Sequence, residues 1–269
     1  TGVQTCALPI CFGIMLGGFW AYVTLGWGGF WAWDPVENSS LIPWLFCVAL
    51  VHTMLVQQKT GGLVKTNIAL ATFAFTMVLY STFLTRSGVL GDTSVHAFVE
   101  PGFFIYLLLL IFLGTFTLGG SSMIVWRWKD MVKHNAPFKK NSREFMLSLG
   151  STVILASAVI VTLGTSYPII CELLNKPKVA VEANFYNLSH IPVIIIMLAL
   201  NACSLALSWK TSEGHVFKRR IVRSIVAAAV ATSLARALGV LDIQWLLLVF
   251  AAWMSLWING EIAVRLVRT

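Results

Sequence analysis

The sequence predicts an all-α fold, a polytopic integral membrane protein with about eight transmembrane helices. Of its 269 residues, 58% are hydrophobic and only 11% are charged, whereas a soluble domain carries roughly 25% charged residues. The mean hydropathy is +0.81, and the apolar residues form long runs between short polar breaks. These observations disfavour a soluble helical protein. A β-barrel is disfavoured because alternating segments of about ten residues do not occur.

Each predicted span holds roughly 17 to 23 residues, enough to cross about 30 Å of hydrocarbon at about 1.5 Å per residue. Helices are favoured because lipid cannot satisfy free backbone groups. Little more than Leu241 and Asp242 separates the last two spans, so we expect them to form a tight antiparallel pair. The eight spans are 7–25, 39–57, 66–84, 103–125, 145–167, 188–209, 222–240 and 243–259.

The distribution of basic residues predicts the topology. With the N-terminus in the cytoplasm, the inner loops hold all but four of the 19 lysines and arginines, as the positive-inside rule requires. The net charge of +8 is therefore explained by topology, and we expect no nucleic-acid partner. The outer face then carries the segments 26–38, 85–102, 168–187 and 240–242.

The second span has a recognisable start. Asp34 can cap a helix, Pro35 suits the first helical position, and Glu37 stands where a capping-box acid belongs. We therefore expect a helix from Pro35 to about Gln57, with an early bend at Pro43.

The stretch WGGFWAWD, just before this helix, concentrates aromatic rings. An interfacial aromatic belt could account for any one tryptophan, but three tryptophans and a phenylalanine within seven residues are denser than a belt requires. Glycines between them let the backbone approach a flat partner, and the rings offer a platform for a large planar apolar molecule. The predicted platform consists of Trp27, Phe30, Trp31 and Trp33, followed by Asp34.

The second outer loop, TRSGVLGDTSVHAFVEP, adds two candidate ligands. An outer-face His96 can offer its imidazole to a metal, although a lone surface histidine is usually only solvated. Arg86 can form paired hydrogen bonds to a carboxylate. A planar apolar body, a metal and carboxylates together describe haem with its iron and propionates.

His52 lies inside the second span, in its predicted cytoplasmic half. Ionisable residues within a membrane are costly, and they are often functional or paired. His52 is either a neutral histidine bonded to its surroundings or an axial ligand of a haem buried between helices. The five cysteines form no C-x-x-C-H motif for covalent haem attachment.

The motif WGGFWAWDPVENSSLIPW closely resembles the tryptophan-rich WWD signature of the haem-handling superfamily. The further motifs VHT, TRSGVLGDTSVHAF and NSREFMLSLGS resemble the CcmF branch, whose members are haem lyase subunits of cytochrome c maturation. The resemblance runs from about residue 12 to the end. TGVQTCALPI resembles a translated sequencing-adapter remnant, so we expect 1–11 to be a non-native or disordered leader. We expect 12–269 to be a haem-handling cytochrome c assembly domain truncated at both ends.

The resemblance implies a function in cytochrome c-type biogenesis. It implies that haem b is bound at the outer-face WWD segment and attached through thioether bonds to an apocytochrome c C-x-x-C-H motif. It further implies that His96 ligates the haem being attached and that His52 ligates a resident transmembrane haem b. Phe30 stands where the family often has tryptophan. Two family ligands, an upstream outer-face histidine and a downstream transmembrane histidine, have no counterpart here.

The same resemblance implies the location and the partners of the protein. The location is the bacterial inner membrane, with the haem site facing the periplasm. The partners are haem, apocytochrome c, a periplasmic haem chaperone, other cytochrome c maturation subunits and the lipid bilayer. An alternative remains open, in which the protein transports haem or loads it onto a periplasmic chaperone without lyase chemistry. The VEN continuation of the WWD motif and the SRE segment favour the lyase branch.

Overall fold

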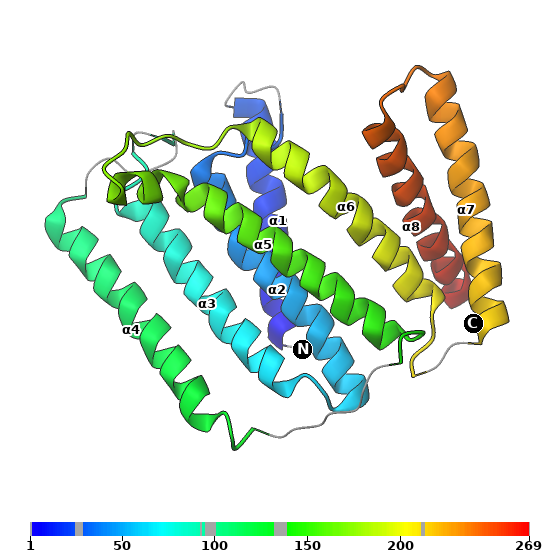
Figure 1. Ribbon diagram of the computed structural model, residues 1–269, viewed down its shortest axis with the longest axis horizontal. Helices are drawn as coiled ribbons and strands as arrows, with labels where there is room; N and C mark the ends of the chain where they lie inside the picture. Colours follow the sequence, from blue (N-terminus) through cyan, green and yellow to red (C-terminus); the bar gives the residue numbers. More distant parts are fainter. Residues whose placement is uncertain are drawn as a thin grey trace. The chain divides into compact units, whose positions relative to one another are not determined.

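The structure, a computed structural model, describes residues 2–24, 29–91, 93–94, 101–131, 139–210 and 213–268. Within these residues all regular secondary structure is helical, which confirms the predicted fold class (Figure 1). The helices are α1 (Gly2–Thr24), α2 (Pro35–Thr60), α3 (Val64–Arg86), α4 (Phe103–Arg127), α5 (Arg143–Leu173), α6 (Ala183–Ala206), α7 (Gly214–Ala237) and α8 (Ile243–Arg268).

Every predicted span overlaps one of these helices, although the spans 188–209 and 222–240 end three residues beyond α6 and α7. Six of them, α2 to α6 and α8, are long and apolar enough to cross a membrane, and the protein is a multi-pass membrane protein. In α1 the corresponding apolar helix is shorter, Cys11–Thr24. Helix α7 carries basic residues along its first half and is not among the six.

Several helices extend beyond the predicted spans. Helix α7 begins at Gly214 instead of residue 222, and α5 continues to Leu173 instead of residue 167. The prediction marked only the apolar part of each helix, whereas the backbone hydrogen bonds of a helix continue into the polar region on either side of the hydrocarbon. Helix α1 begins at Gly2, inside the segment 1–11, whose origin stays a prediction.

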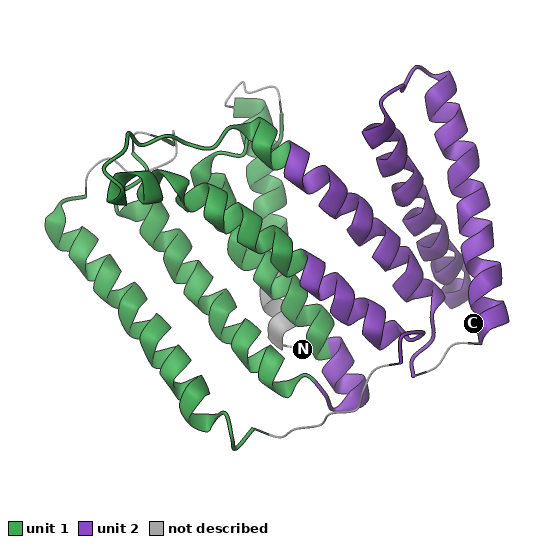
Figure 2. Cartoon of the chain, in the orientation of Figure 1, with its two compact units in different colours: residues 1–54, 63–134, 154–187 green, residues 55–62, 135–153, 188–269 purple. Residues whose placement is uncertain are grey.

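The chain divides into two compact units, coloured separately in Figure 2. Unit 1 comprises residues 1–54, 63–134 and 154–187. Unit 2 comprises residues 55–62, 135–153 and 188–269.

Polar side chains join the helices of unit 1. The hydroxyls of Ser39 in α2 and Ser81 in α3 are 3.0 Å apart, and those of Tyr80 in α3 and Ser166 in α5 are 2.6 Å apart. Such hydrogen bonds between helices satisfy polar groups that lipid cannot. They lie near an apolar core that contains Phe83, Leu84 and Leu90.

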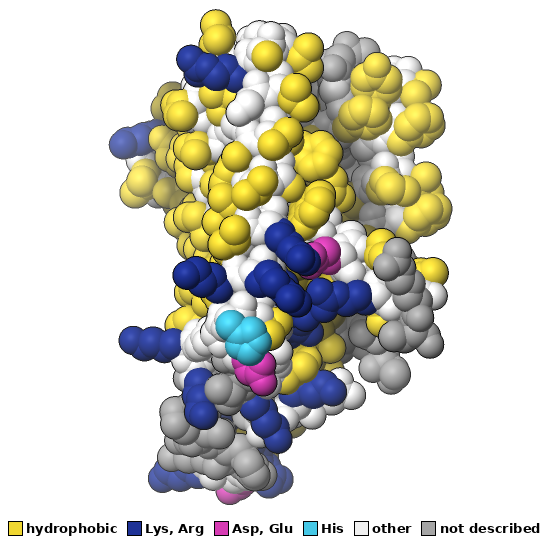
Figure 3. All heavy atoms as spheres, turned by 90° about the vertical axis from the view of Figure 1, so that its right-hand side faces the viewer, with side chains coloured by type: hydrophobic (Ala, Val, Ile, Leu, Met, Phe, Trp, Pro, Cys, Tyr) yellow, Lys and Arg dark blue, Asp and Glu magenta, His cyan; other side chains and the backbone are white. Residues whose placement is uncertain are grey.

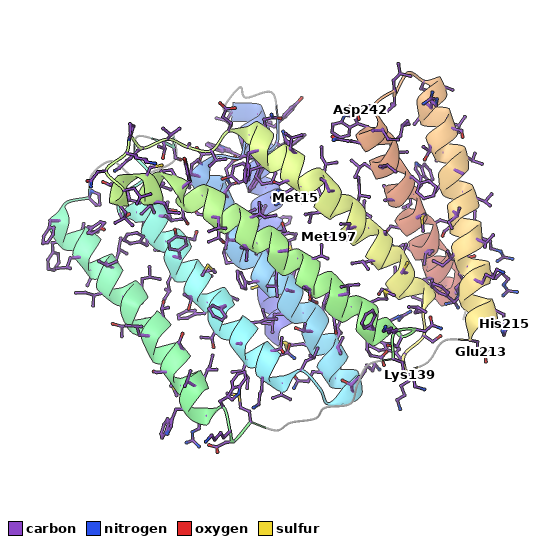
Figure 4. All side chains as sticks on the ribbon, in the orientation of Figure 1. Met15, Lys139, Met197, Glu213, His215 and Asp242 are labelled. Atoms are coloured by element: carbon purple, nitrogen blue, oxygen red, sulfur yellow. The ribbon has the colours of Figure 1, made fainter. Side chains whose placement is uncertain are left out.

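In unit 2, α7 and α8 form the predicted antiparallel pair (Figure 1). Gly239 has a φ of 101°, a conformation that suits glycine, and it follows the end of α7. Asp242 then accepts a hydrogen bond from the Gln244 backbone N–H at 2.7 Å and caps the start of α8. Glu213 and His215, labelled in Figure 4, lie at the start of α7 and are mostly exposed.

The SRE segment, residues 142–144, anchors the start of α5 in unit 2. The Arg143 guanidinium donates hydrogen bonds to the carbonyl oxygens of Ser204, Leu205 and Leu207 at the end of α6. A cation at this place also complements the negative end of the α6 dipole. Glu144 accepts the Lys210 backbone N–H at 2.7 Å. This motif therefore has a structural role that its sequence did not reveal.

Candidate functional site

The aromatic segment is fixed by the cap of α2, as its sequence predicts. Asp34 Oδ2 accepts the Val36 backbone N–H at 2.9 Å. Glu37 Oε2 accepts the backbone N–H groups of Ala32 and Asp34 at 3.0 and 3.4 Å. Helix α2 begins at Pro35 and continues through Pro43 to Thr60. The carboxylates beside the tryptophans thus hold the backbone that presents the rings.

Trp33 is held from several directions. Its φ is 58°, a left-handed conformation that is uncommon for a large side chain. Its carbonyl accepts a hydrogen bond from Asn38 Nδ2 at 3.0 Å. Its ring stacks on Tyr186, with 4.8 Å between centroids and 8° between planes, and its Nε1–H donates to Asn187 Oδ1 at 2.9 Å. These contacts over-determine the strained backbone and fix the ring.

Space for Tyr186 depends on a glycine in the neighbouring helix. The Tyr186 side chain is only 1% exposed. A Cβ atom at Gly164 of α5 would lie 2.5 Å from the Tyr186 hydroxyl oxygen. Any side chain at position 164 would therefore displace the ring on which Trp33 stacks.

Trp31 and Trp33 line one apolar cavity. Their rings meet edge to face, with 6.2 Å between centroids and 87° between planes. The cavity has a volume of about 550 Å³, within the range of about 300–1,000 Å³ that small-molecule and cofactor sites occupy. Met15, labelled in Figure 4, lines it from α1. The other lining residues are Cys11, Ile14, Leu41, Trp44 and Asn187.

A second cavity, of about 420 Å³, also borders Trp31. Gly13 and Gly17 of α1 line it, and a Cβ atom at either glycine would meet nothing within 4 Å. The Trp31 Nε1 atom is buried and makes no hydrogen bond among the residues that the structure describes. A buried donor of this kind is rare in native proteins. Trp31 is therefore the residue, among the described part of the segment, whose side chain has a buried polar atom without a partner.

Phe30 lines neither of these two cavities. Its ring is 55% exposed and stacks on Tyr22 of α1, with 4.5 Å between centroids. Trp27, the remaining member of the predicted platform, lies outside the described residues. The described rings thus form two groups, Trp31 with Trp33 and Phe30 with Tyr22.

The loop that follows α3 is tied to the aromatic segment. The Ser94 hydroxyl donates a hydrogen bond to Asp34 Oδ2 at 2.7 Å, although 60 positions separate them. His96, two residues beyond Ser94, lies outside the described residues. Arg86 lies in the last turn of α3 and is exposed. Asp34 therefore joins the two segments in which the sequence predicts haem-binding residues.

His52 lies in α2 and is half-buried. Its Nδ1 atom is 2.7 Å from the carbonyl oxygen of Val48, one turn earlier. Because a carbonyl oxygen can only accept, Nδ1 carries the hydrogen, and in the neutral ring the lone pair is on Nε2. Metal-bound histidines commonly have this arrangement, in which the other ring nitrogen donates to a carbonyl. Both open interpretations of His52 include a bonded ring, so this contact does not separate them.

Sequence reasoning missed Tyr186, Asn187, Gly164 and Ser94. Tyr186 and Asn187 stand in the sequence YNLSH, which has no recognisable motif, and they meet Trp33 only through the packing of α6. Gly164 is one of two glycines in an apolar helix and one of 20 in the chain. A candidate metal cluster of three or more histidine, cysteine or acidic residues does not occur in the described part of the chain.

The comparisons with known proteins agree with one another. A family model described as cytochrome C assembly protein matches residues 3–90. The cytochrome c-type biogenesis protein CcmF of Pseudomonas aeruginosa is 36% identical over 250 residues, which are 91% of this chain and 37% of that protein. The protein CycK of Bradyrhizobium diazoefficiens is 39% identical over 228 residues, 84% of this chain and 34% of that protein.

A solved structure, described as cytochrome c heme lyase CcmF, is also similar. It has a TM-score of 0.67 and 32% sequence identity, and the match covers 96% of this chain and 37% of that chain. The chain therefore spans little more than a third of the length of these relatives.

Proposed function

Since the chain belongs to the CcmF-type cytochrome c assembly proteins, we propose that it binds haem at the aromatic segment and promotes the attachment of that haem to apocytochrome c. In this role it acts as a haem lyase subunit in cytochrome c-type biogenesis. The substrate is haem b on the outer face of the membrane. The product carries thioether bonds between the haem vinyl groups and the thiols of a C-x-x-C-H motif.

The observation that carries this proposal is the cavity of about 550 Å³ lined by Trp31 and Trp33. Its apolar lining and its aromatic walls suit a flat macrocycle. The buried Nε1–H of Trp31 is a donor that an acceptor on a bound ligand would satisfy. The residues present therefore fit haem at this place.

The proposed partners of the haem iron and of a propionate come from the end of α3 and the loop that follows it. His96 provides an imidazole to the haem iron, and Arg86 pairs with a propionate. The bond between Ser94 and Asp34 supports this assignment, because it ties the loop that carries His96 to the aromatic segment. Asp34 thus acts by holding the loop and the start of α2.

The chain contributes orientation more than acid–base chemistry. Haem supplies the reactive vinyl groups, and the apocytochrome supplies the thiols that add to them. Trp31 and Trp33 form aromatic walls around the substrate, and Phe30 and Trp27 add further aromatic surface in the same segment. A fixed geometry of this kind accelerates a reaction between two bound partners by removing the entropy cost of bringing them together.

A second haem, a resident haem b, is ligated by His52 in the membrane. This role requires a free lone pair on Nε2, and the hydrogen bond between Nδ1 and the Val48 carbonyl is compatible with it. His52 lies about 26 Å along α2 from Pro35, at about 1.5 Å per residue. The two haem sites are therefore separate.

The proposed location is the bacterial inner membrane, with the aromatic segment facing the periplasm. A periplasmic haem chaperone delivers the haem, and other membrane subunits of cytochrome c maturation assemble with the protein. Residues 12–269 form the haem-handling domain.

The test separates ring stacking from iron ligation, in the full-length protein. His96→Ala removes an iron ligand, so haem still docks, but its spin state changes and little holocytochrome forms. Added imidazole restores part of the activity because it occupies the vacated coordination position. Trp31→Ala or Trp33→Ala removes stacking of about 0.5–1.5 kcal/mol per ring beyond the lost buried area. Haem occupancy then falls, and imidazole does not restore it.

Trp126→Ala provides the matched control, because Trp126 is an exposed tryptophan of α4. It should leave haem content and spectrum unchanged. If His96→Ala preserves both the spectrum and cytochrome c assembly, His96 is an ordinary solvated histidine and the assignment is wrong. If haem loads a chaperone but no thioether product forms in the wild type, the protein is a haem-delivery protein instead.

A further inference from the structure

Asn38 ends the VEN continuation of the aromatic motif and lies near the start of α2. Its neighbours in the motif, Asp34 and Glu37, accept backbone N–H groups around the start of the helix. Asn38 acts as a donor instead, because its Nδ2 atom hydrogen-bonds the Trp33 carbonyl oxygen at 3.0 Å. Asn38 is 0% exposed, so bulk water does not compete for this bond.

The backbone of Trp33 needs a restraint of this kind. Its φ of 58° lies in the left-handed region, which a large side chain occupies only at a cost in free energy. Relaxation to a negative φ would redirect the indole, which would then lose its stack on Tyr186 and its bond to Asn187. The bond from Asn38 holds the peptide group that follows Trp33, and it therefore opposes this relaxation.

Asn38 also lies against the ring on which the indole stacks. The Tyr186 hydroxyl interacts with the side chains of Asn38 and Thr165, and all three residues are buried. One amide is therefore in contact with the backbone of Trp33 and with the aromatic partner of its ring. The bond to the Trp33 carbonyl sets the backbone, whereas the contact with the hydroxyl limits where the amide can lie.

The other half of the Asn38 amide is not used in the same way. Its Oδ1 atom is buried and makes no hydrogen bond among the residues that the structure describes. A buried acceptor of this kind lowers stability, and an apolar side chain at position 38 would avoid that loss. Packing alone therefore does not explain an asparagine at this place, whereas its donor to the Trp33 carbonyl does.

We propose that Asn38 is a positioning residue for haem binding and that it acts through Trp33. This inference rests on the proposed function, because Trp33 lines the cavity assigned to haem. The lining includes Trp33 but not Asn38, so Asn38 acts indirectly. A wall that is already oriented binds a ligand more tightly, since less conformational freedom is lost on binding. Without the Asn38 donor the indole leaves this orientation, and the cavity loses one aromatic wall.

The first measurement follows the Trp33 indole by fluorine NMR in the haem-free, full-length protein labelled with fluorotryptophan. The protein is held in nanodiscs because lipid-facing surfaces are apolar, and Figure 3 shows an apolar surface above a band of Lys and Arg side chains. Trp33→Phe identifies the Trp33 resonance by its disappearance. Asn38→Ala and the similarly shaped Asn38→Leu should each shift and broaden this resonance, because loss of the bond lowers the population of the bound orientation about fivefold.

Ser39→Ala is the matched control for these spectra. Ser39 is the next residue of α2 and is 1% exposed, and its hydroxyl bonds to the Val36 carbonyl and lies 3.0 Å from the Ser81 hydroxyl. The change also removes buried hydrogen bonds, but it should leave the Trp33 resonance in place. An unchanged resonance in Asn38→Ala, or an equal shift in Ser39→Ala, overturns the proposal, because a general loosening of α2 would then explain the effect.

The second measurement is haem retention in a double-mutant cycle with Trp33→Gly. Glycine adopts a positive φ readily and carries no ring, so Asn38 has nothing left to position. Asn38→Ala should lower haem retention about fivefold in the otherwise wild-type protein and change it little in Trp33→Gly. Equal losses in the two backgrounds overturn the proposal, because independent sites add.

The two measurements separate this inference from the proposed function. If Trp33→Gly retains haem as well as the wild type does, the proposed haem site is wrong, and the role of Asn38 in haem binding falls with it. If Trp33→Gly loses haem and Asn38→Ala does not, the haem site stands and the inference about Asn38 alone is overturned.

Discussion

Trp33 donates its indole hydrogen bond to Asn187, at 2.9 Å and across 154 positions of sequence. The same ring stacks on Tyr186. Helix α6 therefore supplies both the ring on which Trp33 stacks and the acceptor of its hydrogen bond. Trp33 also lines a cavity. The orientation of this ring is set by residues that the sequence did not mark as functional.

Tyr186 should position Trp33 through its ring and not through its hydroxyl. Tyr186→Phe keeps the stacked ring, so haem content and spectrum should stay close to the wild type. Tyr186→Leu removes the stack, worth about 0.5–1.5 kcal/mol beyond the lost area, so the haem spectrum should broaden or shift. The measurement is the absorption spectrum of the purified full-length protein. Equal spectra for the two variants would show that Tyr186 only fills space.

Gly164→Ala should destabilise the protein, in contrast to the usual effect of this change within a helix. Replacing a helical glycine by alanine ordinarily stabilises by about 0.5–1 kcal/mol. At position 164 the new methyl group would lie 2.5 Å from the Tyr186 hydroxyl, and overpacking costs about 1–3 kcal/mol. Gly150→Ala, on the same helix, meets nothing within 4 Å and is the control. Thermal unfolding of both variants in detergent measures the difference, and equal stability would contradict the tight contact.

His52→Ala should remove a low-spin haem signal without preventing membrane insertion. The change exchanges a polar side chain for an apolar one inside a span, so the helix should insert at least as well as before. Thr53→Ala is a suitable neighbour control, because the Thr53 hydroxyl donates to the carbonyl oxygens of Ala49 and Leu50 within its own helix. An unchanged haem content and spectrum in purified His52→Ala would make His52 a structural histidine.

Cysteine labelling should place Ala32 outside the cell membrane and Lys129 inside it. Both side chains are exposed, and the positive-inside rule assigns them to opposite faces. In a variant without native cysteines, a membrane-impermeant thiol reagent on intact cells should label Ala32→Cys but not Lys129→Cys. Ser39 is a poor reporter because it is 1% exposed. The reverse labelling pattern would invert the topology.

The sequence predicts the helices of this protein well, because lipid leaves the backbone few alternatives. The start of α2 follows from local chemistry, since Asp34 and Glu37 satisfy backbone N–H groups within five residues of themselves. The contacts between the aromatic rings of the site were less predictable. Trp31 and Trp33 share a cavity, but Phe30 pairs with Tyr22, because ring partners depend on how α1 and α6 pack against the segment. Trp27 and His96 stay predictions.

Because the chain is synthesised from its N-terminus, the contact between Trp33 and Asn187 can form only late in synthesis. A ribosome adds about 5–20 residues per second, so Asn187 follows Trp33 by roughly 8 to 30 seconds. During this interval the tryptophan has neither its hydrogen-bond acceptor nor the ring on which it stacks. The aromatic segment can therefore reach its final arrangement only after α6 has been synthesised.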